Sequence, residues 1–219
     1  MHSFLVLHVI ILIMFTNDTL YWIIFAVPSI LIASTIHEYA HGLIAFKLGD
    51  PTAKAEGRLT LNPLSHIDPI GALSMIIFRF GWSKPVPINE NNFEKRELGT
   101  AITALAGPIS NLLLACLLAV INLIFQPNLN SILGNFVLTF TVINLALAFF
   151  NLLPIPPLDG HKIVRAIIPR KARYQWERLE KFSILLLILL ILPILPSGSI
   201  AGTFMSTTIT KTLDLLGFL

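Results

Sequence analysis

Two histidines and one glutamate lie inside a long apolar run of this sequence. The run IIFAVPSILIASTIHEYAHGLIAF covers residues 23–46 and contains His37, Glu38 and His41. A charged or strongly polar side chain at the centre of a membrane-spanning helix costs roughly 2.5–3.5 kcal/mol on insertion scales. Three such groups in little more than one helical turn therefore indicate a functional site.

The spacing of these three residues fits a metal site. On a helix, residues i and i+4 lie on one face, so His37 and His41 can each present a ring nitrogen to one metal ion. Glu38 is rotated by about 100° from His37 and can hold a metal-bound water without being a ligand. In this arrangement zinc lowers the pKa of the water towards about 7 and the glutamate accepts its proton. The alternatives are a chance match and histidines that hydrogen-bond to neighbouring helices, and the cost of these groups in an apolar run disfavours both.

Catalytic zinc usually has three protein ligands, so one more ligand is expected. The candidates elsewhere in the sequence are Glu56, His66, Asp68, Asp159 and His161. The stretch NLLPIPPLDG at 151–160 favours Asp159, because its prolines end the preceding run and Gly160 permits a sharp turn. An extended segment would then present the carboxylate near the cytoplasmic end of a span. A solvated aspartate in a cytoplasmic turn is the alternative.

The composition indicates a membrane protein. The 219 residues are 55% hydrophobic and 12% charged, whereas about 25% of the residues in a soluble domain are charged. Three apolar runs reach the length of about 20 residues that crosses a bilayer, namely 20–46, 100–125 and 131–153. Shorter or interrupted runs, expected to be tilted, incomplete or interfacial, are 3–15, 182–195 and 199–218. We therefore predict an all-α polytopic membrane protein with about five to six transmembrane helices, forming a single domain over residues 1–219.

The basic residues predict the orientation in the membrane. Fourteen of the fifteen lysines and arginines fall within 47–99 and 162–181, which is typical of cytoplasmic loops. The segments 16–19 and 126–131 contain no basic residue and are expected to face outside. This distribution argues against a nucleic-acid partner and places the site towards the cytoplasmic side.

The region between the first two long runs is expected to border the functional cavity. Its segment EGRLTLNPLSHIDPIGALSMIIFRFGWSKPVPIN, residues 56–89, contains repeated proline and glycine, which argues against a helix through it. Short extended pieces and a hairpin that dip partly into the membrane fit the pattern better. Non-helical backbone at that depth is tolerated only against protein or a water-filled cavity. We therefore predict a small β-like or re-entrant element here.

Five motifs resemble those of one enzyme family. HEYAHG, LNPLSHIDPIG, GWSKPVPIN, ALAGPISN and FNLLPIPPLDG occur in the order and at the separations found in the site-2 protease family of intramembrane zinc metallopeptidases. The resemblance covers roughly residues 20–170. It implies a metalloendopeptidase that cuts membrane-spanning protein substrates within or beside a transmembrane helix. We expect a minimal member without a PDZ or CBS domain, in a cell membrane that we expect to be prokaryotic.

The resemblance also implies the roles of individual residues. One Zn²⁺ per chain would be bound by His37, His41 and Asp159, with Glu38 as the catalytic base. Asn151 matches the family's asparagine eight residues before the metal-binding aspartate and is a further catalytic candidate. The sequence gives no indication of the oligomeric state.

Several other polar residues have structural interpretations. His66 and Asp68 are expected to be structural or to line the cavity, and His161 is expected on the cytoplasmic surface. Asn111 either hydrogen-bonds across the helix bundle, a contribution of about 0.6 kcal/mol, or points into the cavity.

Two other functions remain possible from the sequence. A catalytically silent scaffold of the same fold would not need Glu38. An ion or solute transporter would also use intramembrane carboxylates and broken helices, but its expected inverted repeat is not visible.

A helical substrate must unwind before it can be cut, and its freed backbone groups then need partners. The segment 57–88 is predicted to supply a strand edge for this purpose. Asn151 could then donate a hydrogen bond to the carbonyl oxygen as charge develops on it.

Overall fold

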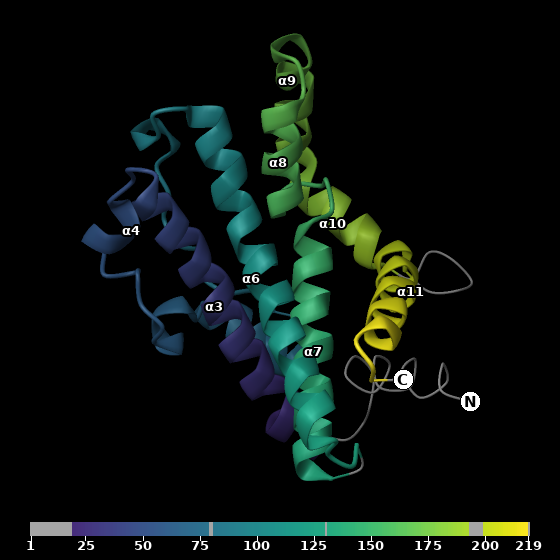
Figure 1. The fold of residues 1–219 in the computed structure, drawn as a ribbon. Helices are drawn as coiled ribbons and strands as arrows, with labels where there is room; N and C mark the ends of the chain where they lie inside the picture. The colour runs from purple at the N-terminus through teal and green to yellow at the C-terminus, as the bar shows by residue number, and fades with distance from the viewer. Residues whose placement is uncertain (1–18, 79–80, 130, 193–198, 219) are drawn as a thin grey trace.

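Three long apolar helices form the centre of the fold (Figure 1). The computed structural model describes residues 19–78, 81–129, 131–192 and 199–218. The central helices are α3 (Val27–Lys47), α6 (Arg96–Phe125) and α7 (Ile132–Asn151). A short turn, α2 (Thr19–Tyr21), and a π-helical turn, η1 (Trp22–Ala26), lead into α3. The segments Trp22–Lys47, Arg96–Phe125 and Ile132–Asn151 are long and apolar enough to cross a membrane, as predicted for the three long runs.

Small residues and interhelical hydrogen bonds hold these helices together. Each of the three contacts the other two, and one buried cluster joins them, with Trp22, Ala26, Ala33, Leu118, Phe140 and Ile143 as members. Lipid tails are as apolar as leucine, so membrane helices associate through close packing and polar contacts rather than through the hydrophobic effect. Ala26 and Ala33 are fully buried, and the hydroxyls of Tyr21 and Thr139 form a hydrogen bond of 2.7 Å. This packing fixes the rotation of α3 relative to α6 and α7.

The segment between α3 and α6 differs from the predicted hairpin. It contains α4 (Thr52–Ala55), the 3₁₀ turns η2 (Pro63–His66) and η3 (Glu90–Asn92), and a helix, α5 (Pro69–Phe78). In the part of the chain that the structure describes, β structure is limited to one antiparallel bridge between Ile67 and Ser83. A re-entrant position for this segment stays a prediction.

The proline and glycine of α5 do not prevent a helix, contrary to the sequence argument. Pro69 is the first residue of α5, where its missing N–H is not needed. The Asp68 carboxylate accepts hydrogen bonds from the backbone N–H groups of Ile70 (2.9 Å) and Gly71 (2.8 Å). Asp68 therefore caps α5 and has a structural role.

Shorter helices follow α7. They are α8 (Asp159–Ile167), α9 (Arg170–Glu177), the 3₁₀ turn η4 (Arg178–Phe182), α10 (Ser183–Ile191) and α11 (Ile200–Leu215). Helix α8 packs against α6, and α11 packs against α7. α10 has 9 residues and α11 has 16, fewer than the roughly 20 that cross a bilayer upright. The predicted run 3–15 lies outside the described residues, so a total of five to six spans stays a prediction.

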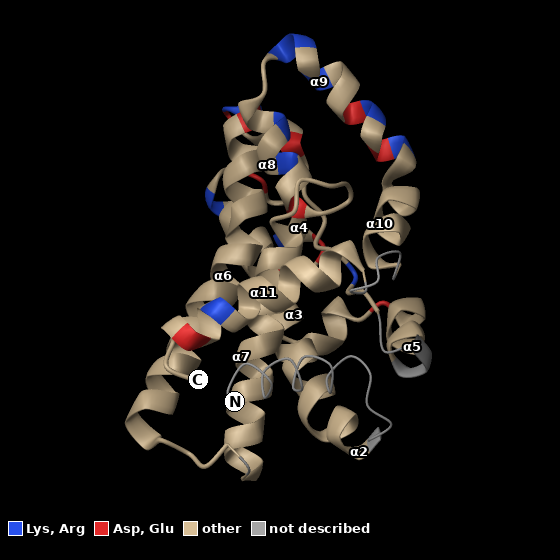
Figure 2. Cartoon of the chain, turned by 90° about the vertical axis from the view of Figure 1, so that its right-hand side faces the viewer, with Lys and Arg blue, Asp and Glu red and all other residues tan. Residues whose placement is uncertain are grey.

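Charged residues gather at one end of the bundle, over α4, α8 and α9 (Figure 2). Both basic stretches of the sequence contribute to this end, because the end of α3 and the start of α6 bound the first stretch, and α8 and α9 carry most of the second. The connection from α6 to α7 lies at the opposite end (Figure 1). The two basic stretches are therefore on the same side of the bundle, which is required if both form loops on one side of the membrane.

Candidate metal centre and active site

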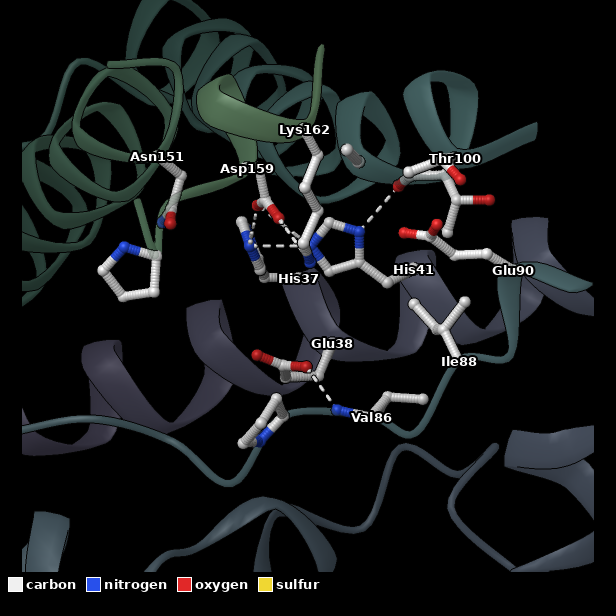
Figure 3. Close-up of a pocket in the computed structure, with 14 residues that line it drawn as sticks. His37, Glu38, His41, Val86, Ile88, Glu90, Thr100, Asn151, Asp159 and Lys162 are labelled. Atoms are coloured by element: carbon white, nitrogen blue, oxygen red, sulfur yellow. Dashed lines mark hydrogen bonds and ion pairs between the residues drawn. The ribbon is translucent and has the colours of Figure 1, made fainter. Parts of the chain in front are cut away.

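His37, His41 and Asp159 converge in the interior of the bundle (Figure 3). One ligand atom from each lies within 4.8 Å of the others. The Asp159 Oδ2 atom is 3.2 Å from His37 Nε2 and 3.1 Å from His41 Nε2, and the two Nε2 atoms are 3.0 Å apart. All three residues are buried, with 6–7% of each exposed. The structure thus brings together the three residues that the sequence proposes as ligands.

The second nitrogen of each imidazole faces a hydrogen-bond acceptor. His37 Nδ1 lies 2.6 Å from Asn111 Oδ1, and His41 Nδ1 lies 2.7 Å from the backbone carbonyl oxygen of Thr103. Because both partners accept, each Nδ1 carries the proton and each neutral ring keeps a lone pair on Nε2. Hydrogen bonding at the outer nitrogen orients metal-binding histidines in this way.

The orientation of the Asn111 amide follows from its other contacts. Its Nδ2 donates to the Ala33 carbonyl (3.1 Å) and to Asn144 Oδ1 (2.9 Å), so its oxygen faces His37. Asn144 in turn donates to the Phe140 carbonyl (2.8 Å). This buried chain of amides connects α6, α3 and α7 and sets the tautomer of His37. Of the two interpretations of Asn111 from the sequence, the structure supports the hydrogen bond across the bundle.

The donor set fits a zinc ion. Two imidazole lone pairs and a carboxylate oxygen, held 3.0–3.2 Å apart, repel one another unless they share a cation. Zn–N and Zn–O bonds of about 2.0–2.1 Å in a tetrahedral site place ligand atoms about 3.3 Å apart, which is close to the observed spacing. Two histidines and a carboxylate are also a common ligand set of catalytic zinc.

Gly107 of α6 keeps the space beside the two imidazoles open. A Cβ atom at this position would lie 2.6 Å from His37 Nε2 and would also collide with His41 Nε2. Gly107 is a site residue that the sequence-based reasoning about metal ligands does not predict. The available signal was a glycine directly before Pro108 within an apolar helix, in the motif ALAGPISN.

Asp159 is held by a tight turn after α7. It is the first residue of α8, not part of an extended segment as predicted. Gly160 packs so closely on the carbonyl oxygens of Leu152 and Leu153 that a Cβ atom would collide with both. The ammonium of Lys162, one helical turn further on, lies 3.8 Å from Asp159 Oδ1. The carboxylate is thus fixed from the side of α8 and remains directed at the histidines.

Glu38 lies in the same cavity but contacts a different segment (Figure 3). Its Oε2 accepts a hydrogen bond from the Val86 backbone N–H (2.8 Å), and its Oε1 accepts one from the Ser83 hydroxyl (3.1 Å). Glu38 is not among the converging ligand atoms. These contacts orient its carboxylate without engaging it in the metal-binding group.

A cavity of about 360 Å³ adjoins these residues. Besides His37, Glu38, His41 and Asp159, it is lined by Pro85, Val86, Ile88, Glu90, Thr100, Thr103, Ala104, Asn151, Pro157 and Lys162. The amide nitrogen of Asn151 donates to the carbonyl oxygen of Leu147 in its own helix (2.9 Å). The predicted site residues therefore all border one cavity.

Asp50 fixes one wall of this region. Its fully buried carboxylate accepts hydrogen bonds from the Asn89 N–H (2.7 Å), the Asn92 amide (2.7 Å) and Thr52. Burial by itself would raise the pKa of Asp50, but the hydrogen bonds from Thr52, Asn92 and Asn89 outweigh it and lower the pKa below its ordinary value. An ionised Asp50 thus connects the end of α3 to the segment next to Ile88 and Glu90.

Two other histidines have structural roles. His66 is buried, and its Nε2 lies 2.8 Å from the Thr60 carbonyl oxygen. His161 is also buried, not on the surface as predicted, because Trp176 of α9 stacks on it with ring centroids 5.0 Å apart. Neither belongs to the group of potential metal ligands found among the described residues.

This chain has a buried group of two histidines and an aspartate inside a bundle of helices long enough to span a bilayer. These features are typical of membrane metalloenzymes. Comparison with known proteins specifies the family. The model of Peptidase family M50 matches residues 120–194, which include Asn151 and Asp159. No solved structure matches the chain.

Three bacterial relatives are described as zinc metalloproteases. The chain is 36% identical over 182 residues to "Putative zinc metalloprotease YwhC" of Bacillus subtilis, covering 80% of this chain and 82% of the relative. It is 31% identical over 180 residues to "Putative zinc metalloprotease Rip2" of Mycolicibacterium smegmatis, covering 75% and 66%. For Rip2 of Mycobacterium tuberculosis the identity is 28% over 167 residues, covering 74% and 64%. The chain therefore belongs to peptidase family M50 and is a membrane zinc metalloprotease.

Proposed function

We propose that this chain, as a single domain over residues 1–219, hydrolyses peptide bonds of membrane-spanning protein substrates. One zinc ion per chain would be held by His37, His41 and Asp159. The observation that carries this proposal is the convergence of three hydrogen-bond acceptors at 3.0–3.2 Å, with both Nδ1 atoms already donating elsewhere. When bound, zinc supplies a Lewis acid that polarises the carbonyl and makes water more acidic.

Glu38 is the proposed general base. It lines the same cavity as the ligands, and its Oε2 is engaged by a backbone N–H at 2.8 Å, whereas Oε1 has only the longer Ser83 contact of 3.1 Å. Oε1 is therefore the oxygen that takes the proton from the attacking water and passes it to the leaving amine. General acid–base catalysis of this kind contributes about 10²–10⁴-fold.

Asn151 is the proposed donor to the substrate carbonyl oxygen. It borders the cavity, but its amide nitrogen is bonded to Leu147. Its side chain must therefore rotate away from the Leu147 carbonyl oxygen to reach the substrate. Removing one such donor typically costs 10²–10³-fold in kcat.

The substrate would lie against the segment that holds Glu38. Pro85, Val86 and Ile88 line the cavity in a stretch without helical structure. This supports the role of residues 57–88 as the surface on which an unwound substrate is bound. Because Val86 already donates its N–H to Glu38, the substrate must find other donors there.

The site is proposed to act on the cytoplasmic side of a prokaryotic cell membrane. The two basic stretches lie at one end of the bundle (Figure 2), and basic loops remain on the cytoplasmic side. The partners are a membrane-spanning protein substrate and the lipid bilayer, with no nucleic acid.

The test is cleavage in lipid vesicles. The parent chain and the Glu38→Gln and Asn151→Ala variants would be reconstituted with a set of labelled single-span peptides. The parent should cut, and Glu38→Gln should keep its zinc but lose about 10²–10⁴-fold in rate, since the carboxamide oxygen can still accept a hydrogen bond but the group cannot take up the proton. Cutting by Glu38→Gln within a few-fold of the parent would exclude Glu38 as the base. Failure of the parent to cut any peptide would count against the reaction itself.

A further inference from the structure

Two threonine hydroxyls in the cavity lack a hydrogen-bond partner among the described residues. Thr100 and Thr103 lie on α6, are 4% and 2% exposed, and line the cavity together with the proposed metal ligands. The Oγ1 atom of each is buried and unpaired within the described part of the chain. A buried hydroxyl without a partner is unfavourable, so either water or a bound molecule must satisfy these groups.

Other helical hydroxyls in this protein avoid that situation. Thr35, Ser110 and Thr141 donate to the carbonyl oxygen three or four residues earlier, at 2.6–2.8 Å. This backward bond is the common arrangement for serine and threonine within helices. Thr100 and Thr103 depart from it, and both lie on the part of α6 that lines the cavity (Figure 3 labels Thr100).

The cavity wall offers few other uncharged donors. Pro85 and Pro157 have no N–H, and the Val86 N–H is bound to Glu38. The carboxylate of Glu90 is engaged by Arg96 and Arg165 at 3.3 Å. An unwound peptide in this cavity needs both donors and acceptors for its amide groups, and a threonine hydroxyl supplies one donor and two lone pairs.

The two threonines are also well placed relative to the metal centre. The backbone carbonyl of Thr103 accepts the hydrogen bond from His41 Nδ1 (2.7 Å), so its hydroxyl is on a residue that touches a proposed ligand. Residues three apart on a helix have Cβ atoms about 5–6 Å apart on one face. The two hydroxyls can therefore bind different polar groups of one extended peptide.

We propose that Thr100 and Thr103 form a subsite that binds the backbone amide groups of the unwound substrate next to the scissile bond. The ligand class is an uncharged, extended peptide segment. This inference rests on the proposed function and specifies which side chains recognise the substrate of that reaction.

The test uses isosteric variants of the parent chain in vesicles with a labelled single-span peptide that contains glycine near its cytoplasmic end. Thr100→Val and Thr103→Val should each raise KM about fivefold, the effect of one lost hydrogen bond, and the serine variants should restore it. Zinc content should not change. The unfolding temperature should stay level or rise, because valine removes an unpaired buried hydroxyl. The matched control is Thr141→Val, whose hydroxyl is buried but already bonded to Val137, and its KM should equal that of the parent.

The outcomes separate this subsite from the proposed function. Cutting by the parent and its loss in Glu38→Gln support the reaction whatever the threonines do. If both valine variants then keep the parent KM, or if they lose zinc or unfold at lower temperature, the subsite is wrong and the threonines are structural. If the parent cuts no peptide, the reaction and the subsite are both overturned.

Discussion

Asn111 Oδ1 lies 2.6 Å from His37 Nδ1, across the interface between α6 and α3. The bond is buried and connects residues 74 positions apart in the chain. It keeps the proton on Nδ1 and the lone pair on Nε2, and therefore connects a residue of α6 to the proposed metal site.

Asn111→Leu should weaken zinc binding without preventing folding. Loss of a partner that orients a metal-bound histidine typically costs 10–100-fold in metal affinity. Competition with a chelator of known affinity measures the change. Thr141→Val is the control and should keep the parent's affinity, because the buried Thr141 hydroxyl bonds only to Val137 of its own helix in the described part of the chain. Equal affinities for the parent and Asn111→Leu would show that this hydrogen bond does not tune the site.

Gly107→Ala should lose zinc while α6 stays helical. The added Cβ would lie 2.6 Å from His37 Nε2 and would force the imidazoles apart, although alanine is a better helix former than glycine by about 1 kcal/mol. Elemental analysis and circular dichroism measure the two effects. A full zinc content in Gly107→Ala would contradict the close approach of α6 to the ligands.

Asp50 should make stability depend on pH in the acid range. Its pKa is lowered in the folded state, so its contribution to stability is present above the ordinary value of about 3.9 and is lost as pH falls through the lowered pKa. Asp50→Asn should lower the free energy of unfolding at pH 7 by about 1–3 kcal/mol and flatten its dependence on pH below about 4. Denaturation in detergent across about pH 3–7 measures the free energy of unfolding and its dependence on pH. This range includes the ordinary pKa of a carboxyl group. If Asp50→Asn loses stability at low pH as steeply as the parent does, other carboxyl groups cause the pH dependence.

Substrates that unwind easily should be cut faster. Glycine, proline or asparagine near the scissile bond weakens a helix, by about 1 kcal/mol for glycine and about 3 kcal/mol for proline relative to alanine. Paired single-span peptides, one with glycine and one with leucine throughout, provide the comparison in vesicles. Equal rates for the two would remove the unwinding requirement and the proposed role of residues 57–88 in binding an unwound strand.

The sequence predicts the site better than it predicts the surroundings of the site. His37 and His41 follow from helical spacing alone, and the proline-rich turn marks Asp159. The contacts of Asn111, Gly107 and Thr103 with the histidines depend on how α6 packs against α3, and local spacing carries no information on that packing. The motif ALAGPISN already suggests a role for Asn111, whereas Gly107 and Thr103 are site residues only because α6 packs against α3.

The differences between the predicted and the observed structure have local physical causes. Proline and glycine argue against a helix through residues 56–89, but Pro69 occupies the first position of α5 and Asp68 caps it. His161 is predicted on the surface from its local sequence, but Trp176, fifteen residues further on in α9, stacks on it and buries it. Both cases show tertiary or capping contacts overriding a composition-based expectation.

Zinc content of the purified chain tests the central claim most directly. The parent should hold about one equivalent of zinc, and chelation should remove both the metal and the activity. His41→Ala and Asp159→Ala should hold far less zinc, whereas His66→Ala and His161→Ala should retain it, because those side chains contact Thr60 and Trp176 instead. If Asp159→Ala keeps a full equivalent while His66→Ala or His161→Ala loses it, the proposed ligand set is wrong.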